Sequence, residues 1–538
     1  MTGEAVLRLT DLRVALRSGT SLVHGVSLTL GRGERAALVG ESGSGKTMVA
    51  LSVLRLNPPA TVISGGRVEL GGTDLTSAAE PELERVRGDR VAMIYQDPLS
   101  CLNPVRTIGN QLVEAIRAHR DLSFAEARAH AIGLLEEVGV PAADRRFRAY
   151  PHEFSGGMRQ RVMIAMAISC EPEVLIADEP TTALDVTTQA RILALLDRLA
   201  EERGMAVLFI THDLAVAAAF CTRIHVMREG RVVEAGPLRE VLSVPGDDYT
   251  RQLLDAVVTL DAEPAGQPAR DVPDRPVLVE AADLVRCFDG DVRAVDGVSL
   301  RIHRGETVGL VGESGSGKST LSQLLLGLDT PTSGSVRYGG TELAGLGARE
   351  LRRSRRDMQV VLQDPIGSLN RRKTVEQIVG VPLVVHERLG RAARRARVAE
   401  ALDQVGLPAG LAGRYPRELS GGQCQRVNIA RAIVLRPSFL VLDEAVSAVD
   451  VVIQAQILDL LAELQARLGL TYLFVSHDLA VVRYMAPRLA VMHGGRIVEM
   501  GSRERIFDAP EHEYTRSLIA AIPSLDIPAA PGRGKPAS

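Results

Sequence analysis

Two glycine-rich segments contain the residue types and the spacing needed to hold phosphate groups. Residues 40–47 and 312–319 both match the pattern G-x-x-x-x-G-K-[ST] and differ only in their last residue. Glycines let successive backbone N–H groups turn toward a phosphate, and the N-terminus of a following helix adds partial positive charge. The lysine reaches the β- and γ-phosphates of a nucleotide. We therefore predict two nucleotide-binding loops, formed by Gly40, Glu41, Ser42, Gly43, Ser44, Gly45, Lys46 and Thr47 and by Gly312, Glu313, Ser314, Gly315, Ser316, Gly317, Lys318 and Ser319.

Two apolar segments each end in an aspartate followed by a glutamate. Residues 174–179 and 440–444 have the composition of buried parallel strands, which deliver their last residues to one edge of a sheet. A carboxylate there and the hydroxyl of the phosphate loop bind Mg²⁺ in phosphoryl transfer. We therefore predict the magnesium ligands Asp178 with Thr47 and Asp443 with Ser319. The next residue, Glu179 or Glu444, would hold the attacking water as a general base. An Asp-Glu pair can also simply end a strand, but the phosphate loop upstream favours the catalytic interpretation.

Two histidines and two glutamines recur at corresponding places. His212 and His477 each lie 34 residues after the aspartate of the strand (178 to 212 and 443 to 477). A single histidine at a strand end is more often structural, but the equal spacing favours a contact with the γ-phosphate. Gln96 and Gln363 stand in Gln-Asp-Pro segments, which are common turns. They gain significance because both occur between the phosphate loop and a helical stretch.

A Ser-Gly-Gly segment that opens a helical stretch provides a second type of anion-binding site. Backbone N–H groups at a helix N-terminus can bind a phosphate. The two segments are far in sequence from the phosphate loop of their own half, so we predict that each serves the nucleotide of the other half. The residues are Ser155, Gly156 and Gly157 in the first half and Ser420, Gly421 and Gly422 in the second.

The chain has the organisation of a duplication. From the Ser-Gly-Gly segments onward, equivalent residues lie 265 positions apart (155 to 420, 178 to 443), which indicates duplicated domains. The order of apolar strands, phosphate loop and helical stretch in each half predicts a parallel-sheet nucleotide-binding core interrupted by a helical insertion. Residues 261–276 contain four prolines and no apolar periodicity, as expected of a linker. The predicted domains are 1–260, with an insertion at about 97–170, and 277–538, with an insertion at about 364–436 and a C-terminal tail from about 510.

Composition excludes several other classes of protein. The 538 residues carry a net charge of −3, are 46% hydrophobic and 24% charged, and contain 3% aromatics and no tryptophan. A base-stacking surface for nucleic acid is therefore not expected. No stretch approaches the ~20 apolar residues needed to span a bilayer, and the N-terminus lacks the apolar region of a signal peptide. The five cysteines show no C-x-x-C spacing, so neither a disulfide framework nor a zinc site is expected. We expect a cytosolic protein.

These motifs, in this order, resemble those of the ABC-transporter ATPases over nearly the whole chain. FSGGMRQRVMIAMAI and IADEPTTALDV are similar to one ATPase of the oligopeptide, dipeptide and nickel importers. LSGGQCQRVNIARAI and VSAVDVVIQAQIL are similar to its partner ATPase. Residues 248–254 and 513–518 (DYTRQLL and EYTRSL) resemble the tail motif of that subfamily. The resemblance implies an α/β fold with two P-loop (RecA-like) ABC nucleotide-binding domains in tandem, each with a helical insertion subdomain.

The resemblance also implies how the site residues are shared. Two ATP molecules with Mg²⁺ would lie head to tail between the halves, with Gln96 and Gln363 as further catalytic groups and magnesium ligands. Phe288 would stack on one adenine. The site of the first phosphate loop would receive Ser420, Gly421, Gly422, Gln423 and Asp450 from the other half, and the second site would receive Ser155, Gly156, Gly157 and Asp185.

The sequence departs from the family pattern at several positions. Leu16 stands where the first half should have an adenine-stacking aromatic residue, and Met158 stands where the second half has Gln423. Ala445 replaces the usual proline after Asp-Glu. No cysteine follows Cys424, so the iron–sulfur cluster held by the C-terminal segment of many relatives is not expected here.

The function implied by the resemblance is ATP hydrolysis that drives transport, with import of peptides or a related solute such as a nickel chelate as the main interpretation. The chain would act at the cytoplasmic face of the membrane with two permease subunits, docked near Gln96 and Gln363, and with a solute-binding protein. An exporter ATPase is an alternative, because transport direction is not encoded in the ATPase. A soluble tandem ATPase of translation or DNA repair is a further alternative. The short proline-rich linker disfavours the translation type, the missing zinc-type cysteine spacing disfavours the repair type, and the tail motif disfavours both.

Overall fold

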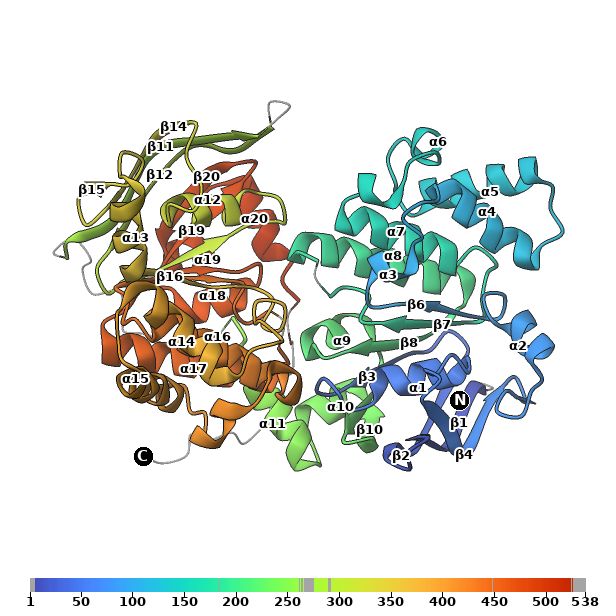
Figure 1. The fold of residues 1–538 in the computed structure, drawn as a ribbon. Helices are drawn as coiled ribbons and strands as arrows, with labels where there is room; N and C mark the ends of the chain where they lie inside the picture. Colours follow the sequence, from blue (N-terminus) through green and yellow to red (C-terminus); the bar gives the residue numbers. More distant parts are fainter. Residues whose placement is uncertain are drawn as a thin grey trace. The chain divides into compact units, whose positions relative to one another are not determined.

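The computed structural model describes residues 5–182, 184–260, 262, 265, 275–288, 292–447, 449–523 and 525. The chain divides into two compact units, with the change between Val257 and Val258 (Figure 1). Most of the linker predicted at 261–276 lies outside the described residues, as does the end of the predicted tail. Among the described residues, no helix combines the length and the apolar character needed to cross a membrane.

The central sheet of the first unit has the strand order β10-β9-β3-β8-β7-β6. All neighbours are parallel except β9 and β10. β7 and β8 are buried along their whole length, in agreement with their apolar sequences. Parallel strands end at the same edge, so the loops after β3, β6, β7 and β8 meet there. The strands are β3 (Arg35–Val39), β6 (Val91–Ile94), β7 (Val174–Asp178), β8 (Ala206–Thr211), β9 (Arg223–Arg228) and β10 (Arg231–Pro237).

A smaller antiparallel sheet, in the order β2-β1-β4-β5, packs against the central sheet. Leu7 and Leu9 of β1 belong to the same buried cluster as Leu38 of β3 and Ile176 of β7. The strands are β1 (Ala5–Leu16), β2 (Ser21–Gly31), β4 (Thr61–Leu70) and β5 (Thr73–Asp74). The helices outside the insertion are α1 (Lys46–Val53), α2 (Glu80–Val86), α8 (Val186–Arg203), α9 (Leu214–Phe220), α10 (Leu238–Ser243) and α11 (Asp248–Ala256).

A group of helices lies between β6 and β7 in the chain. α4, α5 and α7 pack on one another (Figure 1). Their starts follow from side-chain caps: Thr107 accepts the N–H of Asn110, and Ser123 forms a capping box with Glu126. The elements are α3 (Pro98–Cys101), α4 (Ile108–His119), α5 (Phe124–Glu137), α6 (Ala143–Arg146), the 3-10 turn η1 (Pro151–Glu153) and α7 (Gly156–Ala167).

The second unit repeats this architecture. Its central sheet has the order β16-β17-β18-β13-β19-β20 and its smaller sheet the order β12-β11-β14-β15. The strands are β11 (Val277–Phe288), β12 (Val292–His303), β13 (Thr307–Val311), β14 (Ser333–Tyr338), β15 (Thr341–Glu342), β16 (Met358–Val361), β17 (Phe439–Asp443), β18 (Thr471–Val475), β19 (Arg488–His493) and β20 (Arg496–Ser502). The helices are α12 (Lys318–Leu325), α13 (Ala348–Asp357), α14 (Val375–His386), α15 (Arg391–Gln404), η3 (Ala409–Gly413), η4 (Pro416–Glu418), α16 (Gly421–Ile433), α17 (Val451–Leu468), α18 (Leu479–Met485), α19 (Arg503–Asp508) and α20 (Glu513–Ala520).

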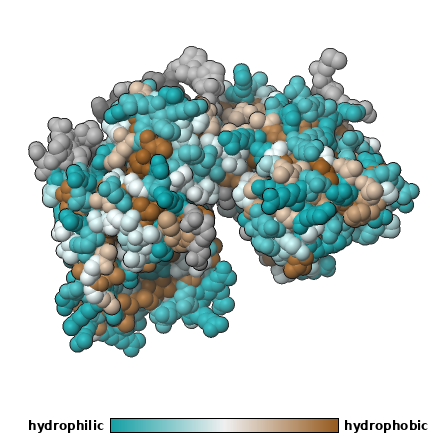
Figure 2. Space-filling view, turned by 90° about the horizontal axis from the view of Figure 1, so that it is seen from above, coloured by the Kyte–Doolittle hydropathy of each residue, from teal (hydrophilic) through white to brown (hydrophobic). Residues whose placement is uncertain are grey.

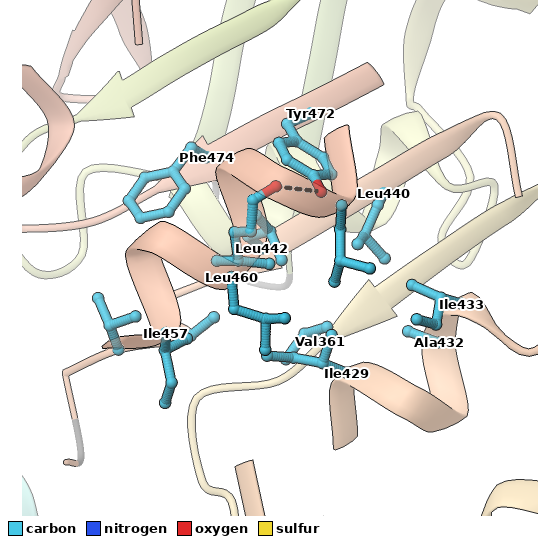
Figure 3. Packing of buried hydrophobic residues seen from close by; sticks show 14 of the residues in the cluster. Val361, Ile429, Ala432, Ile433, Leu440, Leu442, Ile457, Leu460, Tyr472 and Phe474 are labelled. Carbon is cyan, nitrogen blue, oxygen red and sulfur yellow. Dashed lines mark hydrogen bonds between the residues drawn. The ribbon is translucent and has the colours of Figure 1, made fainter. Parts of the chain in front are cut away.

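The hydrophobic core of the second unit joins its central sheet to the helices. Figure 3 shows Leu440 and Leu442 of β17 among side chains of α16 and α17, with the buried Tyr472 hydroxyl donating to the carbonyl of Leu461 (3.0 Å). On the face seen in Figure 2, hydrophilic side chains predominate and hydrophobic ones form smaller patches. The predicted α/β class, with a parallel sheet and a helical insertion in each half, is confirmed.

Candidate functional site

Each predicted phosphate loop joins the central β-strand of its unit to a helix. The first loop runs from β3 into α1, and Gly45 caps α1 with φ +101°, a conformation that favours glycine. A Cβ atom at Gly40 would lie 2.0 Å from the backbone oxygen of Met227, so a larger residue cannot fit. Gly317 has φ +104° at the start of α12, and Gly312 has the same crowded position as Gly40. The sequence pattern therefore corresponds to a tight loop in both units.

The loop lysines are buried and point back over their own loops. Lys46 Nζ donates to the carbonyl oxygens of Gly40 (2.7 Å) and Glu41 (2.8 Å), and its residue is only 5% exposed. Lys318 makes the same two contacts in the second loop, at 2.7 and 2.8 Å. Burial lowers the pKa of Lys318, although nearby carboxylates, led by Glu444, oppose the shift. Each ammonium is thus positioned in the concave side of its loop by backbone carbonyls.

The strand-end aspartates lie beside the loop hydroxyls. The Thr47 hydroxyl is 3.4 Å from Oδ1 of Asp178, which is 2% exposed. Burial raises the pKa of Asp178 to about 6. Burial and the charge of Glu444 also raise the pKa of Asp443. A buried carboxylate whose charge is uncompensated favours a cation as its partner.

Glu179 is the centre of a hydrogen-bonded group at the edge of the first sheet. The Gln96 amide donates to Oε2 of Glu179 at 2.9 Å, and Nδ1 of His212 lies 3.2 Å from Oε1. The Thr182 hydroxyl also donates to Oε2, at 2.9 Å. Glu179 has φ +47°, an unusual backbone conformation for a residue with a side chain. Its N–H is fixed by the carbonyl of Ile210 (2.9 Å).

The second unit has the same group around Glu444. The Gln363 amide donates to Glu444 at 2.6 Å, and Nδ1 of His477 lies 3.4 Å from its carboxylate. Glu444 also has a positive φ, +49°. The structure therefore brings together, within each unit, the glutamine, glutamate and histidine that the sequence placed far apart.

The glutamate and histidine of each group shift one another's pKa. Burial alone would raise the pKa of Glu179, but the hydrogen bond and charge of His212 outweigh it and hold the pKa below its ordinary value. The same contact raises the pKa of His212 against the opposing effect of burial. Glu444 and His477 show the same two shifts. A carboxylate kept ionised in this way is suited to orient a water molecule.

The Ser-Gly-Gly segments open helices α7 and α16. Ser155 caps α7 by accepting the N–H of Met158, and Ser420 caps α16 by accepting the N–H of Gln423. The Gln423 amide oxygen accepts the N–H of Ser420 in return (3.1 Å), which completes a capping box. Met158 offers no such oxygen, and its sulfur instead contacts a guanidinium nitrogen of Arg146 at 2.6 Å. The two helix starts therefore differ in their capping contacts and in polarity.

The remaining predicted residues lie at element ends. Asp450 caps α17 by accepting the N–H of Ile453 at 3.1 Å, and Asp185 precedes α8 and accepts from the Thr187 hydroxyl at 2.7 Å. The second glycine of each Ser-Gly-Gly segment is needed for packing. A Cβ at Gly157 would lie 2.6 Å from a side chain of α8, and a Cβ at Gly422 would lie 2.6 Å from a side chain of α17. These contacts show local structural roles for the segments.

Leu16 and Phe288 occupy the same place in the two units. Each is the last residue of the first strand, β1 or β11. The Phe288 ring is 45% exposed, and the Arg286 guanidinium lies 4.8 Å from its centre. The strand paired with each of these strands comes close to the phosphate loop: a Cβ at Gly45 would lie 3.4 Å from the carbonyl oxygen of Leu22 on β2, and a Cβ at Gly317 would lie 2.1 Å from that of Ala294 on β12. The strand paired with β1 or β11 therefore approaches the phosphate loop, and the contact of Leu16 or Phe288 with adenine stays a prediction.

One pair of residues at these loops was not predicted from the sequence. The N–H of Glu41 donates to the Tyr249 hydroxyl (3.0 Å), and the N–H of Glu313 donates to the Tyr514 hydroxyl (2.9 Å). Both tyrosines belong to the DYTR and EYTR segments, which the sequence marked only as a tail motif. The signal was therefore present, but nothing in the sequence connected it with loops about 200 residues away.

Two segments of the chain, residues 23–182 and 295–447, match the family model described as ABC transporter. Together they cover more than half of the sequence. The chain belongs to the ABC transporter family. A further model, described as "Oligopeptide/dipeptide transporter, C-terminal region", matches residues 498–537. The predicted family and subfamily are thereby confirmed.

Several relatives match the chain over nearly its whole length. The "Peptidoglycan transport ATP-binding protein YejF" of Agrobacterium fabrum is 45% identical, with 97% of each chain covered. The "Oligopeptide transport ATP-binding protein OppD" of Mycobacterium tuberculosis is 42% identical, with 97% of this chain and 99% of the relative covered. The "Glutathione import ATP-binding protein GsiA" of Salmonella typhimurium is 43% identical, with 99% and 91% covered. The chain is therefore an ABC-type ATPase with two nucleotide-binding domains that bind ATP.

Proposed function

We propose that the chain supplies the energy for import of peptides or a related small solute through two separate permease subunits. The observation that carries this proposal is the full-length similarity to three ATP-binding proteins whose names give peptidoglycan, oligopeptide and glutathione as cargo. All three cargoes contain peptide or peptide-like bonds. A nickel chelate is the second candidate cargo, and an extracytoplasmic solute-binding protein would deliver either.

Each site would use one phosphate loop and the groups at the edge of its own sheet. Mg²⁺ fits the hard oxygen donors found there, since a carboxylate and a hydroxyl lie together and the ion would stabilise the charged form of Asp178 or Asp443. Glu179 and Glu444 would orient the attacking water, and His212 and His477 would contact the γ-phosphate. The Ser-Gly-Gly helix starts, Asp185 and Asp450 would complete the site of the opposite half. The domain division 1–260, 261–276 and 277–538 belongs to the same proposal.

A cavity in the first unit supports permease docking near Gln96. It has a volume of about 240 Å³ and lies between β6 and the helical insertion. Apolar side chains predominate in its lining, and two methionines of α7 are among them. Methionine adapts its shape to a partner surface, so an apolar segment of a permease is the occupant we propose. The lining includes Leu54, Met93, Tyr95, Leu102, Met163 and Met166.

The corresponding part of the second unit has a different chemistry. Asn428 and Arg431 stand 265 positions after Met163 and Met166. The Asn428 amide donates to the carbonyl of Pro365 (3.0 Å), and Arg431 donates to the carbonyl of Ser368 (2.8 Å). This polar network ties α16 to the segment after Gln363. The difference favours two unlike permease subunits over two copies of one.

Transport by a reconstituted complex tests the proposed function. The chain is combined in lipid vesicles with the permeases encoded beside it, and ATP is placed on the side that carries the chain. ATP-dependent movement of labelled peptide away from the chain's side would indicate export, and movement toward it would indicate import as proposed. A Lys46→Ala, Lys318→Ala variant serves as the control, because it should not respond to ATP.

Membrane association should depend on the permeases. Expressed alone, the chain should remain in the supernatant after high-speed centrifugation, because the permeases are the membrane attachment that we propose for it. Co-expressed with the permeases, it should sediment with membranes until detergent extracts them. Fractionation followed by immunoblotting measures this, with the isolated permease fraction as reference. Stable co-sedimentation with ribosomes would instead support the translation alternative.

The first site should bind ATP more weakly than the second because of Leu16. An aromatic side chain stacked on a base contributes about 1–3 kcal/mol, and leucine still covers the base with apolar area, so the loss should be tenfold or less. Leu16→Tyr should therefore tighten ATP binding at the first site, measured by titration with the second site disabled by Lys318→Ala. The reciprocal change, Phe288→Leu, should weaken the second site in a Lys46→Ala chain. Unchanged or weaker binding by Leu16→Tyr would contradict the placement of Leu16 at adenine.

A further inference from the structure

Each phosphate loop is held by a tyrosine from the end of its own unit. The Tyr249 hydroxyl accepts the N–H of Glu41 at 3.0 Å across 208 residues, and the Tyr514 hydroxyl accepts the N–H of Glu313 at 2.9 Å across 201 residues. Both contacts join helix α11 or α20 to the second residue of a loop. The same contact occurs in both compact units, so it is not peculiar to one of them.

The tyrosine and the loop lysine hold opposite ends of one peptide group. The peptide that joins Gly40 to Glu41 donates its N–H to Tyr249, while its carbonyl oxygen accepts from Lys46 at 2.7 Å. A rotation of this peptide would break both hydrogen bonds at once. The tyrosine therefore helps to fix the orientation of the carbonyl that positions the lysine ammonium. The second loop has the same arrangement, with the Gly312 carbonyl 2.7 Å from Lys318.

The tyrosines themselves are tightly held. Tyr249 is 2% exposed, and the guanidinium carbon of Arg228 lies 4.9 Å from its ring centre. The Tyr514 ring lies 4.0 Å from the ring of His493, measured between centroids. Burial raises the pKa of Tyr514 to about 12, so it remains a neutral hydroxyl at physiological pH. Arg228 and His493 both end the strand that borders the phosphate loop.

A glutamate fixes the turn that leads into each tyrosine helix. The Glu234 carboxylate accepts the N–H groups of Gly246 (2.7 Å) and Asp247 (3.2 Å), directly before α11. In the second unit, Glu499 accepts the N–H groups of Glu511 (2.8 Å) and His512 (3.1 Å), directly before α20. Backbone hydrogen bonds of this kind hold the helix start in one place, and with it the tyrosine, which is the second residue of each helix.

We propose that Tyr249 and Tyr514 are positioning residues for ATP binding, through which the C-terminal helices α11 and α20 preorganise the phosphate loops. The inference rests on the ATP-binding role of those loops. A loop that is already in its binding conformation pays less ordering entropy when the nucleotide arrives, so its apparent affinity is higher. The segment matched by the C-terminal region model therefore forms part of the nucleotide site, because it contains Tyr514.

The test removes one hydroxyl and keeps the ring. Tyr514→Phe is placed in a full-length Lys46→Ala chain, so that only the second loop binds nucleotide, and binding of Mg²⁺ with a non-hydrolysable ATP analogue is measured by calorimetric titration. Loss of one net hydrogen bond should weaken binding by roughly two- to tenfold. In a chain with both loops intact, Tyr249→Phe with Tyr514→Phe should raise the KM for ATP and leave kcat unchanged.

A matched variant separates positioning from general stability. Tyr472 is buried in the second unit and donates its hydroxyl to the Leu461 carbonyl at 3.0 Å (Figure 3). It pairs with Thr307, at the end of β13 opposite to the loop. Tyr472→Phe should lower the melting temperature to a similar extent without changing nucleotide affinity. Equal affinity of Tyr514→Phe and its parent, or equal weakening by Tyr472→Phe, would overturn the proposal. Retention of full binding after Lys318→Ala in the same parent would overturn both this proposal and the role of the loop.

Discussion

Glu179→Gln and Glu444→Gln should each reduce ATP hydrolysis at the altered site by at least about 10²-fold, the contribution typical of a general base. Glutamine keeps the size of the side chain and can still accept the Gln96 amide or its counterpart. It loses the negative charge that His212 or His477 stabilises. The chemistry should therefore fail while the fold and the phosphate loop remain intact.

The measurement is the steady-state turnover of each single variant and of the double variant, with the permeases bound. Both single variants should lose activity, since the two units contain the same group of glutamine, glutamate and histidine. Glu173→Gln is a suitable control, because this exposed glutamate pairs with Arg90 (2.6 Å) at the opposite end of β7. If one of the two single variants kept full turnover while the other had none, the presence of two competent sites would be contradicted.

The phosphate loops and the strand-end carboxylates could be predicted because their signals are local. A glycine pattern at fixed spacing dictates a tight loop, and an apolar run that ends in Asp-Glu dictates a buried strand with its carboxylate at the sheet edge. Helix boundaries such as those of α4 and α5 were likewise predictable, since Thr107 and Ser123 cap them from the preceding residue. In each case a short stretch of sequence contains the whole physical cause.

The contacts that depend on tertiary packing could not be predicted in this way. Tyr249 reaches the first loop across 208 residues, and only the sheet order brings the ends of β9 and β3 side by side. The positive φ of Glu179 likewise accompanies a hydrogen bond between its N–H and the Ile210 carbonyl on the neighbouring strand. The repetition of these residues in the second half, as Tyr514 and Glu444, indicated that they have a role, but it did not indicate which groups they contact.

The local environment also changed the interpretation of Gln423. The resemblance to the family predicts that Gln423 contacts the nucleotide, a contact that Met158 cannot replace. The structure places its amide oxygen in the capping box of α16, where it accepts the N–H of Ser420. Its contact with nucleotide stays a prediction. The difference between the two halves at this position is therefore first a difference in the stability of a helix start.

Replacing the aspartate that we propose as a magnesium ligand should move stability and activity in opposite directions. Asp178→Asn should abolish Mg²⁺-dependent hydrolysis at the first site, since a neutral amide is a poor substitute for the carboxylate ligand. Without nucleotide, the same change should stabilise the protein. Burial raises the pKa of Asp178 from 3.8 to about 6, which means that the folded state disfavours its charge.

The sign of the pH dependence follows from that shift. Below about pH 4 the carboxyl is protonated in both the folded and the unfolded chain, so the wild-type protein and the Asp178→Asn variant should have similar free energies of unfolding. Between about pH 4 and 6 the unfolded chain ionises first, which lowers the stability of the wild-type protein and leaves the variant unaffected. Above about pH 6 the advantage of the variant should reach its full value. A change of one in pKa corresponds to 1.36 kcal/mol, so the upper limit is roughly 3 kcal/mol.

Calorimetric melting of the nucleotide-free chain in EDTA measures this effect, compared at about pH 4 and pH 7.5. Asp178→Asn should raise the melting temperature of the first unit only at the higher pH, because asparagine keeps an oxygen for the Thr47 hydroxyl (3.4 Å in the parent) and lacks the buried charge. Asp443→Asn should act in the same direction in the second unit, where burial also raises the pKa. Saturating Mg²⁺ and ATP should remove the advantage, because the ion then compensates the charge of the wild-type carboxylate. A variant that melts lower than the parent at pH 7.5 without nucleotide would show that Asp178 is held by contacts that favour its ionised form, and Asp178 would then lose its place as the uncompensated carboxylate that attracts the metal.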